Sequence, residues 1–189
     1  MDYFSVTLFV LDTTKNASPK LPLTVSLLGQ KNLIMTHQLK SPITNERGEK
    51  LVSIMTNISR CHLTDVQASL VLATHESGIV LVKNSEKQVW EIPGGYLEED
   101  ENPYNCARRE LFEESGLIGS SMYLLALLNI ELPFPKESKL KCALFKCQVE
   151  GAPSINTREI SEVSFWNPQS SLTPISAIDN ELLQMYLNE

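Results

Sequence analysis

Apolar and polar residues alternate along two stretches near the start of the chain, which is the pattern of a strand with one buried face. Residues 4–10 carry apolar side chains at every second position, and so do residues 21–27. A turn signal follows at residues 29–32, and residues 51–58 predict a further strand. We therefore expect residues 1–62 to form a small antiparallel β-meander without a helix.

A second block of strands begins after this segment. Apolar runs at residues 68–73 and 79–82 flank a polar stretch at residues 75–78, which predicts a β-hairpin. Residues 90–92 predict a short strand that runs into a Pro-Gly-Gly sequence at residues 93–95. Further strands are predicted at residues 123–128, 139–149 and 163–166.

Two helices are predicted among these strands. Asn102 is a good N-cap, Pro103 suits the first helical position and Gly116 is a good C-terminal stop, so the first helix should cover residues 103–115. An apolar stripe predicts the second helix at residues 178–187. Strands mixed with two helices indicate an α+β fold, arranged as an α/β/α sandwich.

Composition favours an ordinary globular protein. The chain has 189 residues, of which 42% are hydrophobic, and no apolar run approaches the ~20 residues that cross a bilayer. The first residues lack the positive charge of a signal peptide, so we expect a cytoplasmic location without a membrane partner. The four cysteines contain no Cys-x-x-Cys pair, which favours reduced thiols.

Charge is unevenly divided along the chain. Residues 1–60 hold seven Lys and Arg against four Asp and Glu, a balance of +3. Residues 61–189 hold nine against nineteen, a balance of −10. Because nucleic-acid backbones are anionic, so acidic a body argues against a nucleic-acid polymer as partner. It is compatible with holding divalent cations.

The candidate chemistry lies in the first predicted helix. Glu110, Glu113 and Glu114 stand at positions i, i+3 and i+4, so they share one helix face. Three like charges repel one another unless a cation neutralises them, and carboxylate oxygens suit Mg²⁺, with Mn²⁺ as the alternative. Taken without its surroundings, the pattern could equally be the solvated acidic face of a surface helix.

The surrounding segment resembles the Nudix box. That pattern is a glycine, five residues, a glutamate, seven residues and then Arg-Glu-apolar-x-Glu-Glu-x-Gly-apolar. Every defined position is matched, by Gly95, Glu101, Arg109, Glu110, Leu111, Glu113, Glu114, Gly116 and Leu117. The resemblance to Nudix hydrolases covers roughly residues 66–188. It implies a Nudix-type α/β/α sandwich with a mixed β-sheet at residues 63–189, preceded by the β extension of residues 1–62.

The resemblance also implies which residues hold the metal. The three box glutamates are expected to be ligands, as is the carbonyl just ahead of the first box glycine. In this sequence these positions are Glu110, Glu113, Glu114 and Gly94.

Four further residues are expected to support the ligands. In the family, the positions of Glu101 and Arg109 form a salt bridge that holds the loop against the helix and orients the metal ligands. Gly95 and Glu98 also match family positions, and Glu98 is expected to contribute through water.

The reaction implied is attack of water on a phosphorus atom, with a divalent metal ion assisting and a carboxylate accepting the proton of the water. We therefore expect an enzyme that cleaves a phosphoanhydride bond in a small-molecule nucleotide. Glu113 and Glu114 are the first candidates for the general base, followed by Glu162 and Glu159. The sequence assigns no substrate-binding residues.

Three functional hypotheses follow. The first is hydrolysis of ADP-ribose or a nucleotide sugar, because the β extension resembles that of ADP-ribose pyrophosphatases. The second is a (deoxy)nucleoside-triphosphate pyrophosphohydrolase of the nucleotide-sanitising type. The third is a nucleotide-sensing module without catalysis, against which the intact box argues.

The apolar positions of the extension need a partner surface, since an isolated ribbon of this size buries little. We expect residues 1–62 to mediate a homodimer. The rival hypothesis is that they pack on the sheet of the same subunit.

Overall fold

The computed structural model describes residues 5–8, 23–28, 32–56, 58, 63–133 and 138–188, with side chains described from Leu39 onward except at Lys40. The apolar side chains of residues 4–10 and 21–27, on which the dimer hypothesis rests, therefore lie outside the described side chains. In the described part of the chain, no helix is long and apolar enough to cross a bilayer.

Strands dominate the architecture. In chain order they are β1 (Ser5–Leu8), β2 (Leu23–Leu28), β3 (Asn32–Thr44), β4 (Lys50–Thr56), β5 (Ala68–His75), β6 (Gly78–Asn84), β7 (Trp90–Glu91), β8 (Gly94–Tyr96), β9 (Ser120–Glu131), β10 (Lys139–Gln148) and β11 (Ile160–Trp166). Two helices, α1 (Pro103–Ser115) and α2 (Ala177–Leu187), complete the described elements.

The strands form one mixed sheet in the order β1-β2-β3-β4-β9-β10-β5-β6-β11, with β7 beside β6 and β8 beside β5. The β10 and β5 strands run parallel, and Leu144 stands opposite Leu70. The other strand pairs of the sheet are antiparallel among the described residues. The four N-terminal strands follow one another as a meander, as the alternation predicts.

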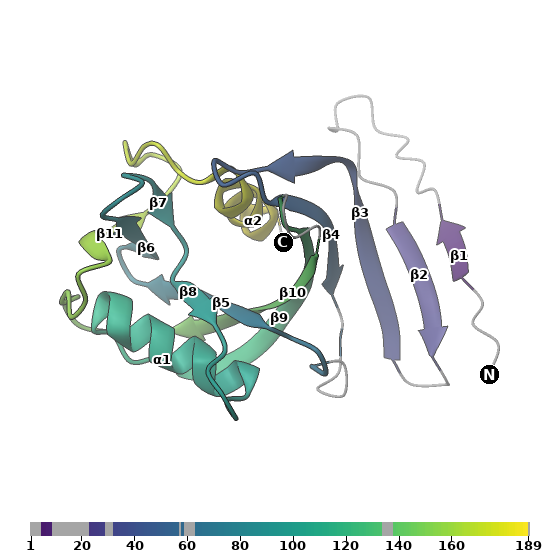
Figure 1. Cartoon of the computed structure of the whole chain (residues 1–189), viewed down its shortest axis with the longest axis horizontal. Helices are drawn as coiled ribbons and strands as arrows, with labels where there is room; N and C mark the ends of the chain where they lie inside the picture. The colour runs from purple at the N-terminus through teal and green to yellow at the C-terminus, as the bar shows by residue number, and fades with distance from the viewer. Residues whose placement is uncertain are drawn as a thin grey trace.

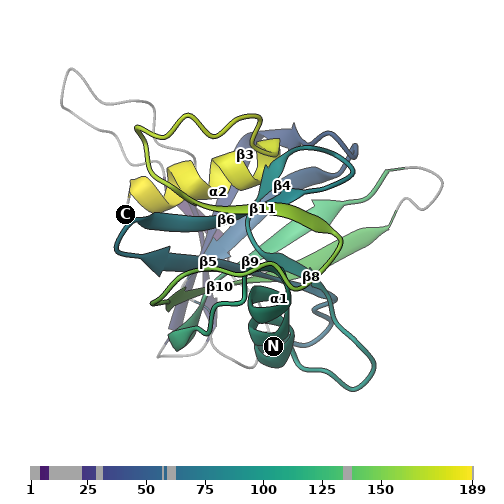
Figure 2. The same cartoon turned by 90° about the vertical axis from the view of Figure 1, so that its left-hand side faces the viewer.

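The two helices cover opposite faces of the central strands (Figures 1 and 2). The core beneath α2 includes Leu182 and Leu183 packed with residues of β9 and β10. The core beneath α1 includes Leu111. The strand residues that it packs against alternate, along the same strands, with those that pack beneath α2. The side-chain period of two along a strand gives the sheet two apolar faces, and this confirms the predicted α/β/α sandwich.

Two elements differ from the prediction. No strand is predicted in the polar stretch of residues 41–50, yet β3 continues to Thr44, where Ile43 pairs with Leu51 across the turn. No strand is predicted for the Pro-Gly-Gly sequence that follows residues 90–92, yet Gly94–Tyr96 forms β8 against β5. Both elements form because their backbones pair with a neighbouring strand. In a short polar or glycine-rich stretch, such pairing produces no periodic pattern of apolar residues in the sequence.

The predicted extension does not end at the edge of a separate sheet. Its last strand, β4, pairs with β9, with Ile54 opposite Leu128. Ile54 is buried. For β4, this pairing is the packing on the sheet of the same subunit that the rival hypothesis expects. The homodimer stays a prediction.

Candidate active site

The helix that carries the box is bounded as its sequence predicts. The Asn102 side chain accepts a hydrogen bond of 3.0 Å from the backbone N–H of Asn105, and Pro103 opens the helix. Gly116 ends it in the left-handed conformation at φ 70°, with its N–H bound to the Phe112 carbonyl. Glycine adopts this conformation without strain, so the helix ends at Ser115, one residue after its last glutamate.

The two glycines ahead of the helix allow close packing on both sides. A Cβ at Gly94 would collide with the backbone carbonyl oxygen of Ser69 on β5. A Cβ at Gly95 would collide with the Glu110 carboxylate. The glycine strand β8 is therefore wedged between the sheet and the acidic face of α1.

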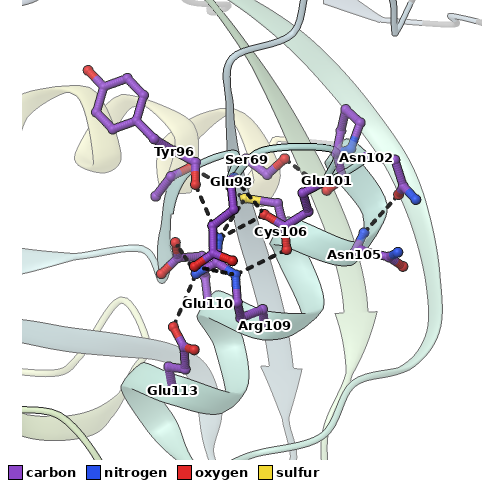
Figure 3. Close-up of polar contacts among 12 residues, drawn as sticks. Ser69, Tyr96, Glu98, Glu101, Asn102, Asn105, Cys106, Arg109, Glu110 and Glu113 are labelled. Atoms are coloured by element: carbon purple, nitrogen blue, oxygen red, sulfur yellow. Dashed lines mark hydrogen bonds and ion pairs between the residues drawn. The ribbon is translucent and has the colours of Figure 1, made fainter.

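Arg109 lies at the centre of the polar network in Figure 3. Its Nε and Nη2 donate to the two carboxylate oxygens of Glu101 at 3.0 and 2.9 Å, a bidentate pair. Nη2 also donates to the Tyr96 carbonyl at 3.1 Å. The bond from Arg109 holds the pKa of Glu101 below its usual value. The expected salt bridge is present and ties the loop after β8 to the helix.

Glu114 is the most deeply placed of the box glutamates. Its Oε2 accepts a 2.9 Å hydrogen bond from the Gly94 N–H. Burial raises its pKa to about 8, and the charge of Glu110 adds to the shift. Burial also raises the pKa of Glu110. Both shifts mean that negative charge on this face is costly until a cation compensates it.

Glu113 and Glu98 lie further toward solvent. The Glu113 side chain is 52% exposed and accepts 3.1 Å from Arg109 Nη1. The Glu98 side chain is 70% exposed, and its carboxylate lies 3.9 Å from Arg109 Nε. Arg109 Nη1 also donates to the Glu110 carboxylate at 2.8 Å. One guanidinium therefore partly neutralises the acidic face.

The two candidates from the C-terminal half differ in their surroundings. The Glu162 carboxylate on β11 lies 2.7 Å from Lys83 Nζ and is 56% exposed. Its partner is therefore a lysine of β6. Glu159, just before β11, lies close enough for its charge to raise the pKa of Glu114.

The donor set fits a hard divalent cation. Glu110 and Glu114 offer carboxylate oxygens beside the backbone of Gly94, and the pKa of each carboxyl is raised where a cation would lower it. The Glu113 carboxylate is bound to Arg109, and no three His, Cys, Asp or Glu side chains of the described residues are placed so that together they could hold a metal ion. That Glu110, Glu113, Glu114 and the Gly94 backbone would hold Mg²⁺ stays a prediction.

A pocket of about 120 Å³ adjoins this face. Gly94, Gly95 and Glu114 are among the residues that line it. The charged and amide side chains that also line it, which the sequence did not single out, are those of Asn45, Arg47, Glu49, Glu91 and Asp179. The chain gathers them from the β3–β4 turn, β7 and α2. The one sequence feature that could have pointed to this pocket is Asp179, an acidic residue within the apolar stripe of the second helix.

Comparison with known proteins identifies the family. The sequence model of the NUDIX domain matches residues 63–186, and the chain belongs to this family. The matched segment contains α1, the glycine strand and Glu159, whereas the β3–β4 turn lies outside it.

Two curated relatives are similar over part of their length. A MutT-like protein of Streptomyces ambofaciens is 24% identical over 106 residues, 56% of this chain and 66% of the relative. A probable DHNTP pyrophosphohydrolase of Lactococcus lactis subsp. cremoris is 28% identical over 106 residues, 51% of this chain and 64% of the relative. The chain thus spans slightly under two thirds of each.

Two solved structures share the fold. The Bacillus subtilis pyrophosphohydrolase BsRppH (E68A mutant) has a TM-score of 0.59 at 16% identity, covering 78% of this chain and 93% of its own. The MutT NUDIX hydrolase of Burkholderia pseudomallei has a TM-score of 0.53 at 16% identity, covering 62% of this chain and 94% of its own. These likenesses establish the Nudix fold predicted from the box.

Proposed function

We propose that this chain is a pyrophosphohydrolase that cleaves a phosphoanhydride bond in a triphosphate carried by one ring-bearing group. The observation that carries this proposal is a pocket of about 120 Å³ whose lining includes Glu114, Gly94 and Asp179. The phosphates would lie at the box end and the ring at the Asp179 end. The curated relatives support it, since one is named a DHNTP pyrophosphohydrolase and one MutT-like.

In this proposal water attacks a phosphorus atom of the substrate, the P–O bond of the anhydride breaks, and the products are a monophosphate and pyrophosphate. A divalent cation would offset the charge on the phosphates and make the attacking water more acidic. Glu110 and Glu114 would hold the cation, and Arg109 keeps the acidic face in place through Glu101. A glutamate accepts the proton of the water, and Glu113, Glu114, Glu159 and Glu162 are the candidates.

The ADP-ribose or nucleotide-sugar class, expected first from the sequence, is the second candidate. The observation that favours it is the set of strands β1–β4 ahead of the family segment, which resembles the extension of ADP-ribose pyrophosphatases. Such a substrate carries a ring system at each end of its diphosphate, and the pocket beside Glu114 offers a place for one.

A substrate panel separates these classes. Purified protein with Mg²⁺ is incubated with nucleoside triphosphates, dihydroneopterin triphosphate, ADP-ribose and a nucleotide sugar, and products are resolved by ion-exchange chromatography. Triphosphates are expected to yield pyrophosphate and a monophosphate. Faster turnover of ADP-ribose or the nucleotide sugar would replace the triphosphate class by the second candidate. A Glu114→Gln variant controls for contaminating hydrolases.

A further inference from the structure

The β3–β4 turn is closed on itself by hydrogen bonds. The Asn45 side-chain oxygen accepts hydrogen bonds from the backbone N–H groups of Arg47 and Glu49, both at 3.0 Å. The Asn45 amide donates to Glu49 Oε2 at 2.7 Å, and Arg47 Nε donates to the same oxygen at 2.9 Å. Asn45 is 6% exposed although it is polar. A turn tied in this way moves as one unit, and Asn45, Arg47 and Glu49 all line the pocket.

An ion pair joins this turn to β7. Arg47 Nη1 lies 3.3 Å from Glu91 Oε1, and Lys87 Nζ, from the segment between β6 and β7, lies 3.8 Å from the same oxygen. That oxygen is buried and accepts no hydrogen bond from the described residues, so charge provides the attraction. The Glu91 side chain is 14% exposed, and solvent therefore screens this attraction less than it would at the surface. Of the two cations, Arg47 is the one that belongs to the turn.

The segment on the other side of this ion pair is held by its own backbone. The Trp90 N–H and carbonyl each make a 2.9 Å hydrogen bond with the backbone just ahead of α2. The Pro93 carbonyl accepts a 2.8 Å hydrogen bond from the Val71 N–H. None of these three bonds involves the Glu91 side chain. Glu91 is therefore a fixed anchor for Arg47.

The turn itself lies beyond the strand pairing. The pairing of β3 with β4 ends at Thr44 and Lys50, and the pairing of β4 with β9 also ends at Lys50. Residues 45–49 are thus not fixed by these ladders, and β3 leads into them beside α2 (Figure 1). The position of the turn over the pocket depends on its side chains, and the Arg47–Glu91 ion pair ties it to β7.

We propose that Arg47 and Glu91 are positioning residues that hold the β3–β4 turn as one wall of the substrate pocket. The turn lies outside residues 63–186, the segment that the NUDIX model matches. A part of the chain ahead of the family segment thus completes the pocket within the same subunit. The proposal rests on the function proposed above in that this pocket takes the substrate, and it holds for either candidate substrate class.

Loss of the ion pair should weaken substrate binding and leave the chemical step in place. The pocket is small, about 120 Å³, so displacement of one wall removes a large share of its contacts with a substrate. The hydrogen bond of 2.9 Å from the Gly94 N–H to Glu114 links β8 to α1 without help from the turn. Breaking the Arg47–Glu91 pair should therefore raise KM and spare kcat.

Steady-state kinetics with dihydroneopterin triphosphate, or with ADP-ribose if the substrate panel favours it, test this split. Glu91→Gln keeps the shape of the side chain and removes its charge, and Arg47→Met removes the cation. Each is expected to raise KM at least about tenfold and to change kcat by less than about threefold. The double variant should raise KM no further than one single variant does, because both changes break the same contact.

Lys87→Met is the matched control. Lys87 faces the same Glu91 oxygen as Arg47 does, but it does not belong to the turn. If the effect comes from holding the turn, Lys87→Met should keep KM within about threefold of the wild-type value. If it comes from the charge near Glu91 alone, Lys87→Met and Arg47→Met should act alike.

Tryptic cleavage of the native protein reports the position of the turn without any substrate. Cleavage after Arg47 requires the turn to leave β7, and proteolysis follows the population of the open form. The cut after Arg47 is expected to be at least about tenfold faster in Glu91→Gln than in wild type, and unchanged in Lys87→Met. The cut after Arg158, in another exposed loop, serves as the internal reference.

Several outcomes would overturn the proposal. They are a wild-type KM in Glu91→Gln, a fall in kcat without a rise in KM, additive effects in the double variant, and an equal rise of KM in Lys87→Met. Thermal melting checks folding, and Glu91→Gln carries the test if Arg47→Met does not fold. If the wild-type protein turns over no substrate of the panel, the proposed function fails. The cut after Arg47 then decides the placement of the turn, and an unchanged rate in Glu91→Gln would refute it.

Discussion

The Arg109 guanidinium donates two hydrogen bonds to the Glu101 carboxylate, Nε to Oε1 at 3.0 Å and Nη2 to Oε2 at 2.9 Å. This pair spans the loop between the glycine strand and α1. It holds the loop against the helix and so fixes the loop relative to the acidic face of α1.

Replacing Arg109 by alanine should therefore destabilise the fold. Glu101 would lose its donors and two further glutamates would lose a neutralising neighbour, so we expect a loss of ~1–3 kcal/mol in the free energy of unfolding. Chemical denaturation measures it, with Arg108→Ala as the control because Arg108 is exposed on the same helix. An Arg109→Ala protein as stable as the control would contradict the supporting role.

The contact between Gly95 and Glu110 leads to a second prediction. A methyl group at Gly95 would push the Glu110 carboxylate, which is the end of a flexible side chain, whereas one at Gly94 would meet the Ser69 backbone. Gly95→Ala should thus keep most of its stability but lose activity and bind Mg²⁺ more weakly. Gly94→Ala should lower the melting temperature as well. Circular dichroism and Mg²⁺ titration of both variants check this, and full activity in Gly95→Ala would argue against a role for Glu110.

Asp179 predicts how stability depends on pH. Burial raises its pKa from 3.8 to about 7. In that interval the unfolded chain has lost the proton that the folded chain keeps, so this group's contribution to stability is full below pH 3.8 and declines as pH rises to about 7. Asp179→Asn should remove up to about 1.4 kcal/mol per pH unit of that decline. Urea unfolding at a series of pH values measures the slope, and an identical slope in wild type and variant would refute the shift.

The two C-terminal glutamates should separate in kinetic experiments. Glu162 is bound to Lys83 at 2.7 Å, whereas the charge of Glu159 reaches Glu114. We expect Glu159→Gln to lower kcat more than Glu162→Gln does, by about 10² if Glu159 is the general base. Glu162→Gln should stay close to wild type. A larger fall in kcat for Glu162→Gln would assign the general base to Glu162. Full activity in both variants would leave the box glutamates as the candidates.

Sequence predicted the helix of the site residue by residue because its signals are local. Asn102, Pro103 and Gly116 mark its ends, and the spacing of Glu110, Glu113 and Glu114 defines its acidic face. The Arg109–Glu101 pair also followed from the family pattern. These features depend on neighbours within about two dozen residues of chain.

The pocket could not be predicted in this way, since its residues come from distant segments. Arg47 and Glu91 are brought together by the turn between β3 and β4 and by a two-residue strand. Nothing in either local sequence distinguishes these residues from ordinary surface charges. The same holds for β8, whose glycines gain a partner only when β5 lies beside them.

The most direct test of the account is the rate of pyrophosphate release from a triphosphate in Mg²⁺, compared between wild type and Glu114→Gln. Glu114 is buried beside Gly94, and Mg²⁺ would stabilise its ionised form. The variant keeps the shape of the side chain and loses the charge, so kcat should fall by about 10² or more while the melting temperature without metal is kept or raised. Glu113→Gln should show a loss of similar order if it shares the cation. Pyrophosphate release at the wild-type rate from Glu114→Gln at saturating Mg²⁺ would contradict the assignment of this site.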